Sequence, residues 1–456
     1  MMLEDYLVQN AARYPEKTAV VCGSQQLTWH QLHQLVCQRA DLWRSSCPPG
    51  RIVCLRAQSD IDFLVSYYAL HLLGCVVAPL EVTMPQAAFN RLSDEVSACQ
   101  APDGTADILY TTGTTGRSKG VCVSHRAILA DAANLIEGQH FTHDLGFVVC
   151  GPLCHLGSLS KVWPVTVLGA TLIMVDGLKD MDRFFAAFEW PAPRMATFLV
   201  PASIRMLLQF AAGRLASYAG KIDFIETGAA AIAQSDMETL CRLLPHSRLY
   251  NTYASTETGI VATFNFNDGL CQAGCLGRPM SRSEVFITDD GRIACKGETL
   301  MSGYLGDAER TAEVMRDGVV YTSDLGTLDA DGRLHLQGRH DDVVNVGGYK
   351  VSPAEVEAAA LSMPVIDDCV CTSVDHPLTG KALKLLVVMK PGCPLDKRAV
   401  AQHLKGLLEP YKIPMLYEQT DAVKRTFNGK IDRKQYESSS CGTSSGDDKK
   451  NNLKPK

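Results

Sequence analysis

The sequence predicts an α/β protein: a large N-terminal domain of parallel-type sheets with helices plus a small distorted barrel, followed by a small α+β C-terminal domain. Three observations predict it. Apolar, β-branched runs alternate with helical patterns over about the first 280 residues. Short strand patterns with tight turns follow, and a further mixed segment begins near residue 342. Alternation of strand and helix is typical of parallel sheets covered by helices.

The elements follow one another regularly along the first part of the chain. Residues 51–55 and 75–80 are predicted strands, and residues 62–73 form the helix between them. Further buried strands are expected at 145–153, 170–176, 195–201, 221–228 and 247–253, with helices at 203–213 and 233–244. We therefore expect largely parallel sheets covered by helices.

The later part of the chain has a different pattern. Residues 283–297 and 324–338 each contain an Asp-Gly pair between two apolar runs, which predicts β-hairpins. Residues 342–360 open a small α+β segment that extends to about Tyr436. The stretch 437–456 is rich in Ser, Gly and Lys and almost free of apolar residues, so we expect a disordered tail.

Composition restricts the class of protein. The 456 residues are 46% hydrophobic and 21% charged, as in an ordinary soluble enzyme, and the net charge of −6 gives no indication of nucleic-acid binding. The 17 cysteines lack the spacing of a metal site, which favours thiols in a reducing compartment. No secretory signal and no apolar run of about 18–20 residues is present, so we expect a cytoplasmic protein without membrane insertion.

A glycine- and threonine-rich loop at residues 110–120, "YTTGTTGRSKG", is the first candidate site. It lies between a predicted strand at 106–110 and a predicted helix at 125–139. A strand–glycine loop–helix order suits phosphate, because backbone N–H groups near a helix start can face an anion. The Walker pattern does not fit, since Lys119 follows Ser118 rather than glycine. Taken alone, the loop could also be a hairpin or a linker.

Five ordered segments resemble the motifs of acyl-adenylate-forming (AMP-binding) enzymes: acyl-CoA synthetases, aryl-CoA ligases and nonribosomal peptide adenylation domains. The loop is similar to their "TSGTTGxPKG" signature. Downstream stand "NTYASTETG" (251–259), "YTSDLG" (321–326), "GRHDDVVNVGGYKVSPAEVE" (338–357) and "FNGKIDRK" (427–434). The resemblance covers roughly residues 5 to 436 and is strongest to the acyl- and aryl-CoA ligases.

The resemblance implies an ATP-dependent acid–thiol ligase. A carboxylate would attack the α-phosphate of ATP, giving an acyl-adenylate and pyrophosphate, and a thiol would then release AMP. The β- and γ-phosphates would be enclosed by a set of loop residues, Thr111, Thr112, Gly113, Thr114, Thr115, Gly116 and Lys119. Glu257 would hold Mg²⁺, since a hard cation prefers carboxylate oxygen, and Thr256 would touch the α-phosphate.

The resemblance also implies a nucleotide-binding set. Tyr253 would stack on adenine, Asp324 would accept hydrogen bonds from both ribose hydroxyls, and Arg339 would support the ribose. Residues 226–232, "ETGAAAI", match a strand end that borders the adenine and the acyl pocket. The complete set is Gly228, Ala229, Ala230, Asn251, Thr252, Tyr253, Asp324 and Arg339.

Catalysis is expected to depend on a lysine far from the loop. By resemblance, Lys430 bridges the substrate carboxylate and the α-phosphate, so the mobile C-terminal domain must close over the ATP site. Asp341 matches the hinge, and Gly347, Gly348 and Lys350 would line a thiol tunnel after the domain rotates. The implied organisation is an AMP-binding domain at 1–339, a hinge at 340–341, a C-terminal domain at 342–436 and a tail at 437–456.

The segment 151–170 restricts the acid. It reads "GPLCHLGSLSKVWPVTVLGA", resembles the "PLFHxxG" of acyl- and aryl-CoA ligases, and lacks the aspartate that pairs with an α-ammonium group. A small carboxylic acid without an α-amino group is therefore favoured. His155 and Ala254 are expected at the acyl pocket, and Ala254 stands where the family usually has glycine, which would narrow the pocket. A buried, hydrogen-bonded structural histidine is the alternative for His155.

Three alternatives remain open at this point. The acceptor thiol is either CoA or the phosphopantetheine arm of an acyl carrier protein. A non-catalytic nucleotide-binding module is a rival from another class, supported by departures such as Ser118 for the usual proline and Ser323 for a glycine. The segment 81–110 is also shorter than the family usually has, which affects the edge of one sheet but removes no catalytic motif.

Overall fold

The computed structural model describes residues 1–112, 118–346, 349–377, 379–426 and 431–436. They form two compact units, with one ending at Asp341 and the other beginning at Asp342. The predicted tail, 437–456, lies outside the described residues. Among the described residues, all sixteen cysteines are free thiols. Within the same ranges, no helix combines the length and apolarity needed to cross a bilayer.

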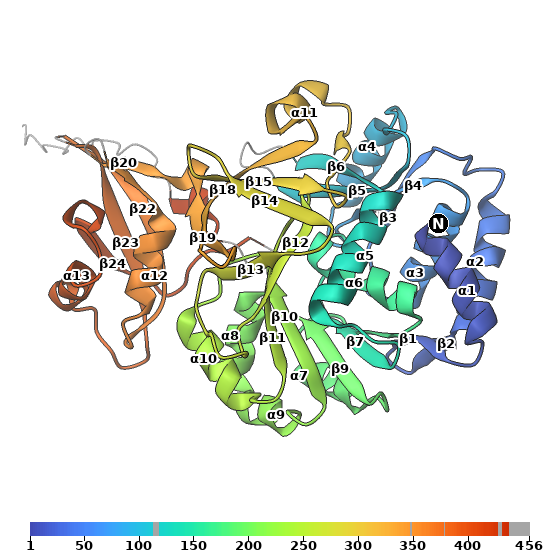
Figure 1. Ribbon diagram of the computed structural model, residues 1–456, viewed down its shortest axis with the longest axis horizontal. Coiled ribbons are helices and arrows are strands. Elements are labelled where there is room, and N and C mark those ends of the chain that lie inside the picture. The colour runs from blue at the N-terminus through green and yellow to red at the C-terminus, as the bar shows by residue number, and fades with distance from the viewer. Residues whose placement is uncertain (113–117, 347–348, 378, 427–430, 437–456) are drawn as a thin grey trace, which may run out of the picture. The chain divides into compact units, whose positions relative to one another are not determined.

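One large sheet runs through the first unit (Figure 1). From edge to edge its strands are β2 (Gln25–Thr28), β1 (Thr18–Cys22), β8 (Thr171–Met174), β7 (Leu145–Val149), β9 (Arg194–Phe198), β10 (Ile222–Gly228), β11 (Arg248–Ser255), β12 (Gly259–Asn265), β13 (Cys275–Pro279), β19 (Leu334–Arg339), β18 (Val319–Leu328), β15 (Arg292–Gly297) and β14 (Ser283–Ile287). In this spatial order, each strand from β1 through β8, β7, β9 and β10 to β11 pairs in parallel with the next. Each strand from β11 to the edge strand β14 pairs antiparallel with the next. The antiparallel strands, which correspond to the small barrel predicted from the sequence, have their own hydrophobic core.

A second sheet carries the glycine-rich loop. Its order is β3 (Ile52–Arg56), β4 (Val76–Leu80), β5 (Thr105–Thr112), β6 (Ser118–Ser124) and β16 (Gly303–Tyr304). Strands β3 to β5 are parallel, whereas β5 and β6 form an antiparallel hairpin to which β16 adds. The shortened segment before the loop contains one helix, α4 (Gln86–Ser97).

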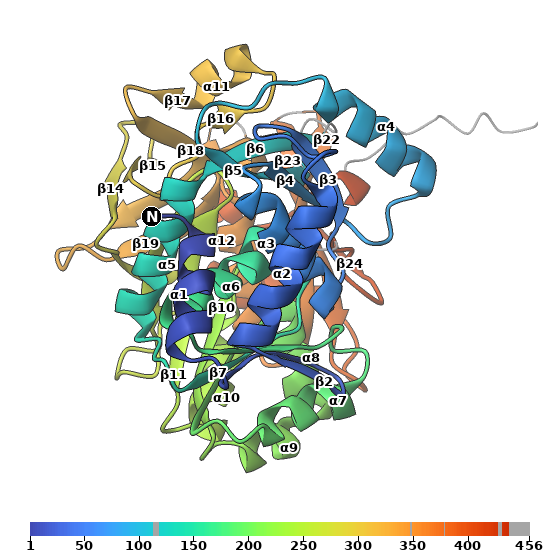
Figure 2. The same ribbon diagram turned by 90° about the vertical axis from the view of Figure 1, so that its right-hand side faces the viewer.

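Helices fill the space between the two sheets (Figure 2). They are α1 (Leu3–Arg13), α2 (Trp29–Trp43), α3 (Ile61–Leu72), α5 (His125–Gln139) and α6 (Leu156–Leu168). Helices α7 (Met181–Ala186), α8 (Pro201–Phe210), α9 (Ala212–Ser217) and α10 (Gln234–Leu243) cover the other face of the large sheet, and α11 (Ala308–Val314) precedes β17 (Met315–Arg316). Successive residues alternate between the two cores, Phe147 and Phe224 in one, Val148 and Ile225 in the other. Burial on both faces explains the continuous apolar strands.

The second unit is a small α+β body with its own core. Its elements are β20 (Val344–Val346), β21 (Tyr349–Val351), α12 (Pro353–Leu361), β22 (Ile366–His376), β23 (Gly380–Met389), α13 (Lys397–Lys405) and β24 (Leu416–Gln419). Strands β22, β23 and β24 form its three-stranded sheet, and α12 contacts β22. Two 3₁₀ turns, at Pro410–Lys412 and Arg433–Tyr436, complete it, and a third, at His340–Asp342, spans the division between the units.

The structure corrects one expectation. Helix α5 spans His125–Gln139 as predicted, but strand β6 lies between the loop and this helix, so the direct strand–loop–helix order expected from the sequence is wrong. The apolar run Val121, Cys122 and Val123 is buried against β5 and its neighbours, which favours an extended strand at this position. Strands β5 and β6 therefore flank residues 113–117 in the sequence, and β6 separates these residues from the N-terminus of α5.

Candidate active site

The phosphate-loop residues belong to the β5–β6 hairpin. Thr111 and Lys119 are opposite one another in the antiparallel register, directly before the tip. The backbone of Thr112 continues β5. Gly113, Thr114, Thr115 and Gly116 lie outside the described residues. The structure therefore describes the two paired strands on either side of residues 113–117.

Three side chains meet beside this hairpin. The ammonium group of Lys119 lies 5.2 Å from the centroid of the Tyr304 ring, and the Tyr304 hydroxyl donates a 3.0 Å hydrogen bond to Oε1 of Glu257. Strand β16 brings Tyr304 here because Tyr304 pairs with Val121 of β6. Burial and the neighbouring Glu257 carboxylate raise the pKa of Tyr304, so its hydroxyl remains a donor. A cation and a carboxylate are thus held side by side on one tyrosine.

Glu257 stands in the tight turn between β11 and β12, with Thr256 before it; both are half-buried. The hydroxyl groups of Ser255 and Thr258 close this turn by accepting each other's backbone N–H bonds. The carboxylate oxygens of Glu257 are the ligand type that Mg²⁺ prefers, and the adjacent lysine suits phosphate oxygens. The donor set at this point therefore fits a magnesium nucleotide.

A second polar cluster contains the predicted ribose residues. The Tyr253 hydroxyl donates a 2.8 Å hydrogen bond to Oδ2 of Asp324, and Arg339 Nε lies 3.5 Å from Oδ1 of the same carboxylate. Asp324 and Arg339 are cross-strand partners in β18 and β19. Burial and the Asp324 charge raise the pKa of Tyr253. The structure thus brings these three predicted residues together.

The strand end after β10 has an unusual backbone. Ala229 has a φ of +67°, a left-handed conformation that a residue with a Cβ rarely adopts and that costs about 1–3 kcal/mol. Gly228 lies so close to β11 that a Cβ there would stand 2.8 Å from the Thr252 carbonyl oxygen. Ala230 follows, half-buried. Strained backbone at the carboxyl end of a parallel strand is typical of a ligand site in α/β sheets.

Asn251 and Thr252 have their side chains engaged inside the protein. Asn251 Nδ2 donates to the Cys275 carbonyl at 3.1 Å, and the Thr252 hydroxyl contacts Gln139 and Thr263 at 3.1 and 3.0 Å. Both residues are buried. Their side chains therefore connect β11 to its neighbours and to α5 behind the end of β10.

His155 lies in a small polar group at the start of α6. Its Nε2 is 4.0 Å from Oε2 of Glu81, the residue that follows β4, and Cys154 Sγ donates to the same oxygen at 3.4 Å. Burial and Glu81 raise the pKa of Cys154 to about 12, so this thiol is protonated. Ala254 is half-buried at an irregularity in the pairing of β11 with β12.

A buried ion pair supports the same region and was not predicted. Lys161 of α6 lies 2.7 Å from Glu226 of β10, two residues before Gly228, and each side chain is 1% exposed. The ammonium group also lies 5.1 Å from the ring centroid of Phe198. Burial lowers the pKa of Lys161, and Glu226 opposes that shift. Lys161 is the lone charge in α6, but β10 contains Asp223 as well as Glu226, so no sequence pattern singles out this pair.

In the smaller unit, two motif segments are tied together. Arg433 makes two hydrogen bonds to the Glu357 carboxylate, at 2.7 and 2.8 Å, and one to Asp342 at 3.0 Å. Arg425 and Ile431 form a β-bridge across the segment 427–430. Lys430 itself, like Gly347 and Gly348, lies outside the described residues. The flanks of Lys430 are therefore anchored within this unit.

Two further predicted residues are described in part. Lys350 is exposed on β21, where its neighbour Tyr349 stacks on Tyr411 with ring centroids 4.4 Å apart. Asp341 belongs to the 3₁₀ turn His340–Asp342. That turn stands at the division between the two units.

Tyr304 is the main residue that sequence reasoning missed near the loop. Its partners, Lys119 and Glu257, come from distant parts of the chain, so no spacing pattern points to it. Glu81 was missed for the same reason. Only the pairing of β16 with β6 and the end of β4 bring these residues to the site.

Comparison with known proteins gives a consistent picture. Residues 7–99 and 90–305 match the family described as AMP-binding enzyme, and residues 355–430 match its C-terminal domain. A propanoyl:CoA ligase acting on an octahydroindenyl substrate from Mycobacterium tuberculosis is 30% identical over 74% of this chain and 67% of its own length. A feruloyl-CoA synthase from Amycolatopsis is 27% identical over 94% of this chain and 97% of its own.

The fold is shared with solved structures. ATP-bound MatB from Rhodopseudomonas palustris superposes with a TM-score of 0.83 at 22% identity, covering 96% of this chain and 98% of its own. The O-succinylbenzoate coenzyme A synthetase of Bacillus subtilis, solved with AMP, gives a TM-score of 0.82 at 21% identity, with coverages of 95% and 98%. Both likenesses extend over nearly the whole chain.

Proposed function

The chain belongs to the AMP-binding enzyme family, and on that premise we propose that it is an AMP-forming acid–thiol ligase. It activates a carboxylic acid with ATP to an acyl-adenylate, releasing pyrophosphate, and then transfers the acyl group to coenzyme A, releasing AMP. The observation that carries this proposal is the meeting of Lys119, Tyr304 and Glu257 beside the glycine-rich hairpin. The relatives named as CoA ligases and synthetases support it.

In the first half-reaction, one oxygen of the substrate carboxylate attacks the α-phosphorus and the bond to pyrophosphate breaks. The negative charge on the phosphoryl oxygens is met by Lys430 and by Lys119 with the loop residues, and Thr256 hydrogen-bonds the α-phosphate. Glu257 would hold Mg²⁺, which supplies further charge neutralisation when bound. Tyr304 keeps the side chains of Lys119 and Glu257 next to each other, since it contacts both.

The nucleoside half of ATP is held by the second cluster. Asp324 accepts the ribose hydroxyls, Arg339 supports that carboxylate, and Tyr253 stacks on the adenine. The strand end Gly228–Ala230 lines the other side of the base. The contacts among Tyr253, Asp324 and Arg339 support this assignment because they fix the carboxylate before the nucleotide arrives.

In the second half-reaction, the thiol sulfur attacks the acyl carbonyl carbon and AMP leaves with the bond electrons. We assign the hinge to residues 340–341, between an AMP-binding domain at 1–339 and a mobile domain at 342–436. Rotation about Asp341 would withdraw Lys430 and bring Gly347, Gly348 and Lys350 to the thiol path. The turn at His340–Asp342 and the division of the chain there support this hinge.

The acid lacks an α-amino group and enters beside His155 and Ala254. The absence of an aspartate in segment 151–170 supports this, as do relatives named for feruloyl, succinylbenzoate and indoleacetate substrates. Coenzyme A is the acceptor named for these relatives; an acyl carrier protein is the alternative acceptor. The free thiols of the described residues support a reducing, cytoplasmic compartment.

The test is acid-dependent exchange of pyrophosphate into ATP with a panel of aryl and aliphatic acids, followed by thioester formation with either acceptor. We expect exchange with at least one acid lacking an α-amino group and a CoA thioester of that acid. If a holo-carrier protein is loaded and no CoA thioester forms, the acceptor is a carrier protein rather than CoA. Absence of exchange with every acid would contradict the proposal and favour a non-catalytic nucleotide-binding protein.

Replacing Asp324 with asparagine is expected to raise KM for ATP by about 100-fold or more, because two charge-assisted hydrogen bonds to the ribose would be lost. Tyr253→Phe is the matched control: it removes the 2.8 Å bond to Asp324 but keeps the ring that stacks on adenine. We expect that change to raise KM less than about tenfold. Steady-state pyrophosphate release measures both. An unchanged KM in Asp324→Asn would refute the ribose assignment.

A further inference from the structure

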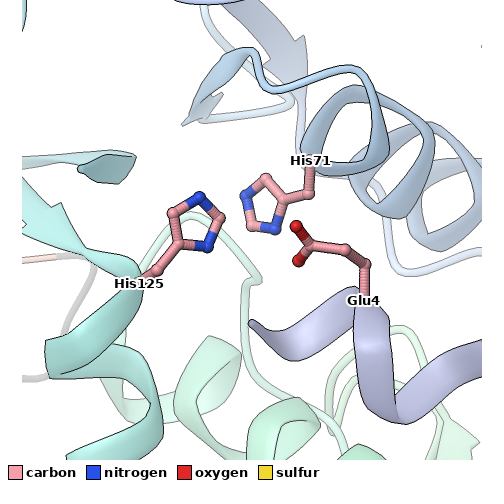
Figure 3. Close-up of side chains that lie close together, drawn as sticks. All are labelled: Glu4, His71 and His125. Atoms are coloured by element: carbon pink, nitrogen blue, oxygen red, sulfur yellow. The ribbon is translucent and has the colours of Figure 1, made fainter. Parts of the chain in front are cut away.

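Three ligand-type side chains converge away from the proposed ATP site (Figure 3). Glu4 comes from α1, His71 from α3 and His125 from the first residue of α5. One oxygen or nitrogen from each lies within 4.8 Å of the others. Glu4 is 3% exposed and His71 1% exposed. Their side chains point toward one another in the space enclosed by the three helices.

The facing atoms have no hydrogen-bond partners. This holds for both carboxylate oxygens of Glu4 and for Nδ1 of His71 and of His125. A buried ionised carboxylate without a partner is strongly unfavourable, and buried polar groups are otherwise nearly always paired. Four unpaired ligand atoms directed at one point therefore indicate a group that the protein chain does not supply.

The arrangement behind His71 is typical of a metal-ligating histidine. Its Nε2 donates to Oδ1 of Asp107 at 3.0 Å, which leaves the lone pair on Nδ1 facing the cluster. Asp107, fully buried, also accepts a 2.7 Å bond from the Tyr67 hydroxyl, and Trp163 Nε1 in turn contacts that hydroxyl at 3.3 Å. The ring of His71 is therefore fixed in one tautomer and one orientation.

We propose that Glu4, His71 and His125 bind one divalent transition-metal ion, with Zn²⁺ the best match. Two imidazoles and one carboxylate are a ligand set that zinc accepts, with a fourth position left for water. Zinc–ligand bonds of about 2.0–2.2 Å would require the three ligand atoms to approach one another to about 3.3 Å. The negative charges of Glu4 and Asp107 balance the charge of a divalent cation in this buried space.

A bound ion would connect α1 to the strands of the β5–β6 hairpin, which carries the glycine-rich loop. Asp107 stands on β5, four residues before Thr111, and His125 follows the last residue of β6. The ion would thus fasten the N-terminal helix and both strands of the hairpin at their base. The arrangement that competes with it is a proton shared between Glu4 and one of the histidines.

The experiment measures metal bound to the full chain. Protein stripped with a chelator is equilibrated with Zn²⁺, desalted and assayed by elemental mass spectrometry. We expect one equivalent of Zn²⁺ in the wild type, and a loss of affinity of at least tenfold in Glu4→Gln and in His125→Asn. Two controls should keep the metal: His246→Gln, an exposed histidine, and Cys154→Ser, from the Glu81–Cys154–His155 group, which also has ligand-type atoms within 4.8 Å.

Two further measurements test the ligand set and the effect of the ion on stability. Co²⁺ substitution should give the ligand-field absorption of a four-coordinate ion without a thiolate charge-transfer band. Zn²⁺ should also raise the melting temperature of the wild type but not of Glu4→Gln. Absence of tightly held metal in the wild type, retention in both cluster variants, or loss in Cys154→Ser would each overturn the proposal. A thiolate band would do the same.

Discussion

Replacing Lys430 with alanine is expected to slow acyl-adenylate formation about 100- to 1,000-fold, the effect of removing one fixed charge from a transition state. The lysine is proposed to bridge the substrate carboxylate and the α-phosphate, so its loss acts on kcat more than on KM for ATP. Acid-dependent pyrophosphate exchange measures this step. Attack of coenzyme A on a synthetic acyl-adenylate should stay within about threefold of the wild type, because Lys430 is proposed to act only in the first half-reaction.

Lys424→Ala is the matched control for this experiment. Lys424 is exposed and lies close to Lys430 in sequence, and we expect its replacement to leave both half-reactions unchanged. Two results would contradict the assignment of Lys430: exchange that survives its removal, or equal losses in both half-reactions. The second result would indicate damage to the C-terminal unit rather than loss of one charge.

Breaking the buried pair between Lys161 and Glu226 is expected to cost about 3–5 kcal/mol of folding free energy in the larger unit. Each side chain is 1% exposed, so removal of one partner leaves a charge that water does not reach. For a unit of this size the corresponding fall in melting temperature is about 4–7 °C. Glu226→Gln and Lys161→Met should both show it, by calorimetry or by circular dichroism.

The double variant Lys161→Met/Glu226→Leu separates the pair from the packing around it. Replacement of both charges by apolar side chains of similar volume is often neutral, so we expect the double variant to recover most of the lost stability. A double variant as unstable as the sum of the single ones would show that the two residues act independently. It would also exclude the ion pair as the cause of the single effects.

Much of the fold follows from local patterns. The apolar runs at 145–149 and 222–228 are strands buried on both faces, and their composition alone marks them as central parallel strands. Strand β6 was not predicted, because the segment 118–124 begins with loop-type residues and its apolar core is only three residues long. Its pairing with β5 and β16 decides its conformation, and pairing between distant strands is not visible in the sequence.

The candidate site divides in the same way. Glu257, Asp324 and Lys119 could be selected because each stands within a recognisable motif. Tyr304, Glu81 and Lys161 could not be selected, because their partners lie far away in the sequence. Tyr304, for example, contacts Glu257, 47 positions away, and Lys119, 185 positions away. Neighbours that are brought together by folding carry no shared spacing, so only the structure identifies them.

The position of Tyr304 has a consequence for hydrogen exchange. Its backbone belongs to the sheet of the β5–β6 hairpin, whereas its hydroxyl is bonded to Glu257 in a turn of the large sheet. A nucleotide held by Lys119 on one sheet and Asp324 on the other would have to dissociate before the two sheets could separate. Opening motions that expose the amides of β5, β6 and β16 would then become rarer as ATP saturates the protein, and exchange rates there would report nucleotide occupancy.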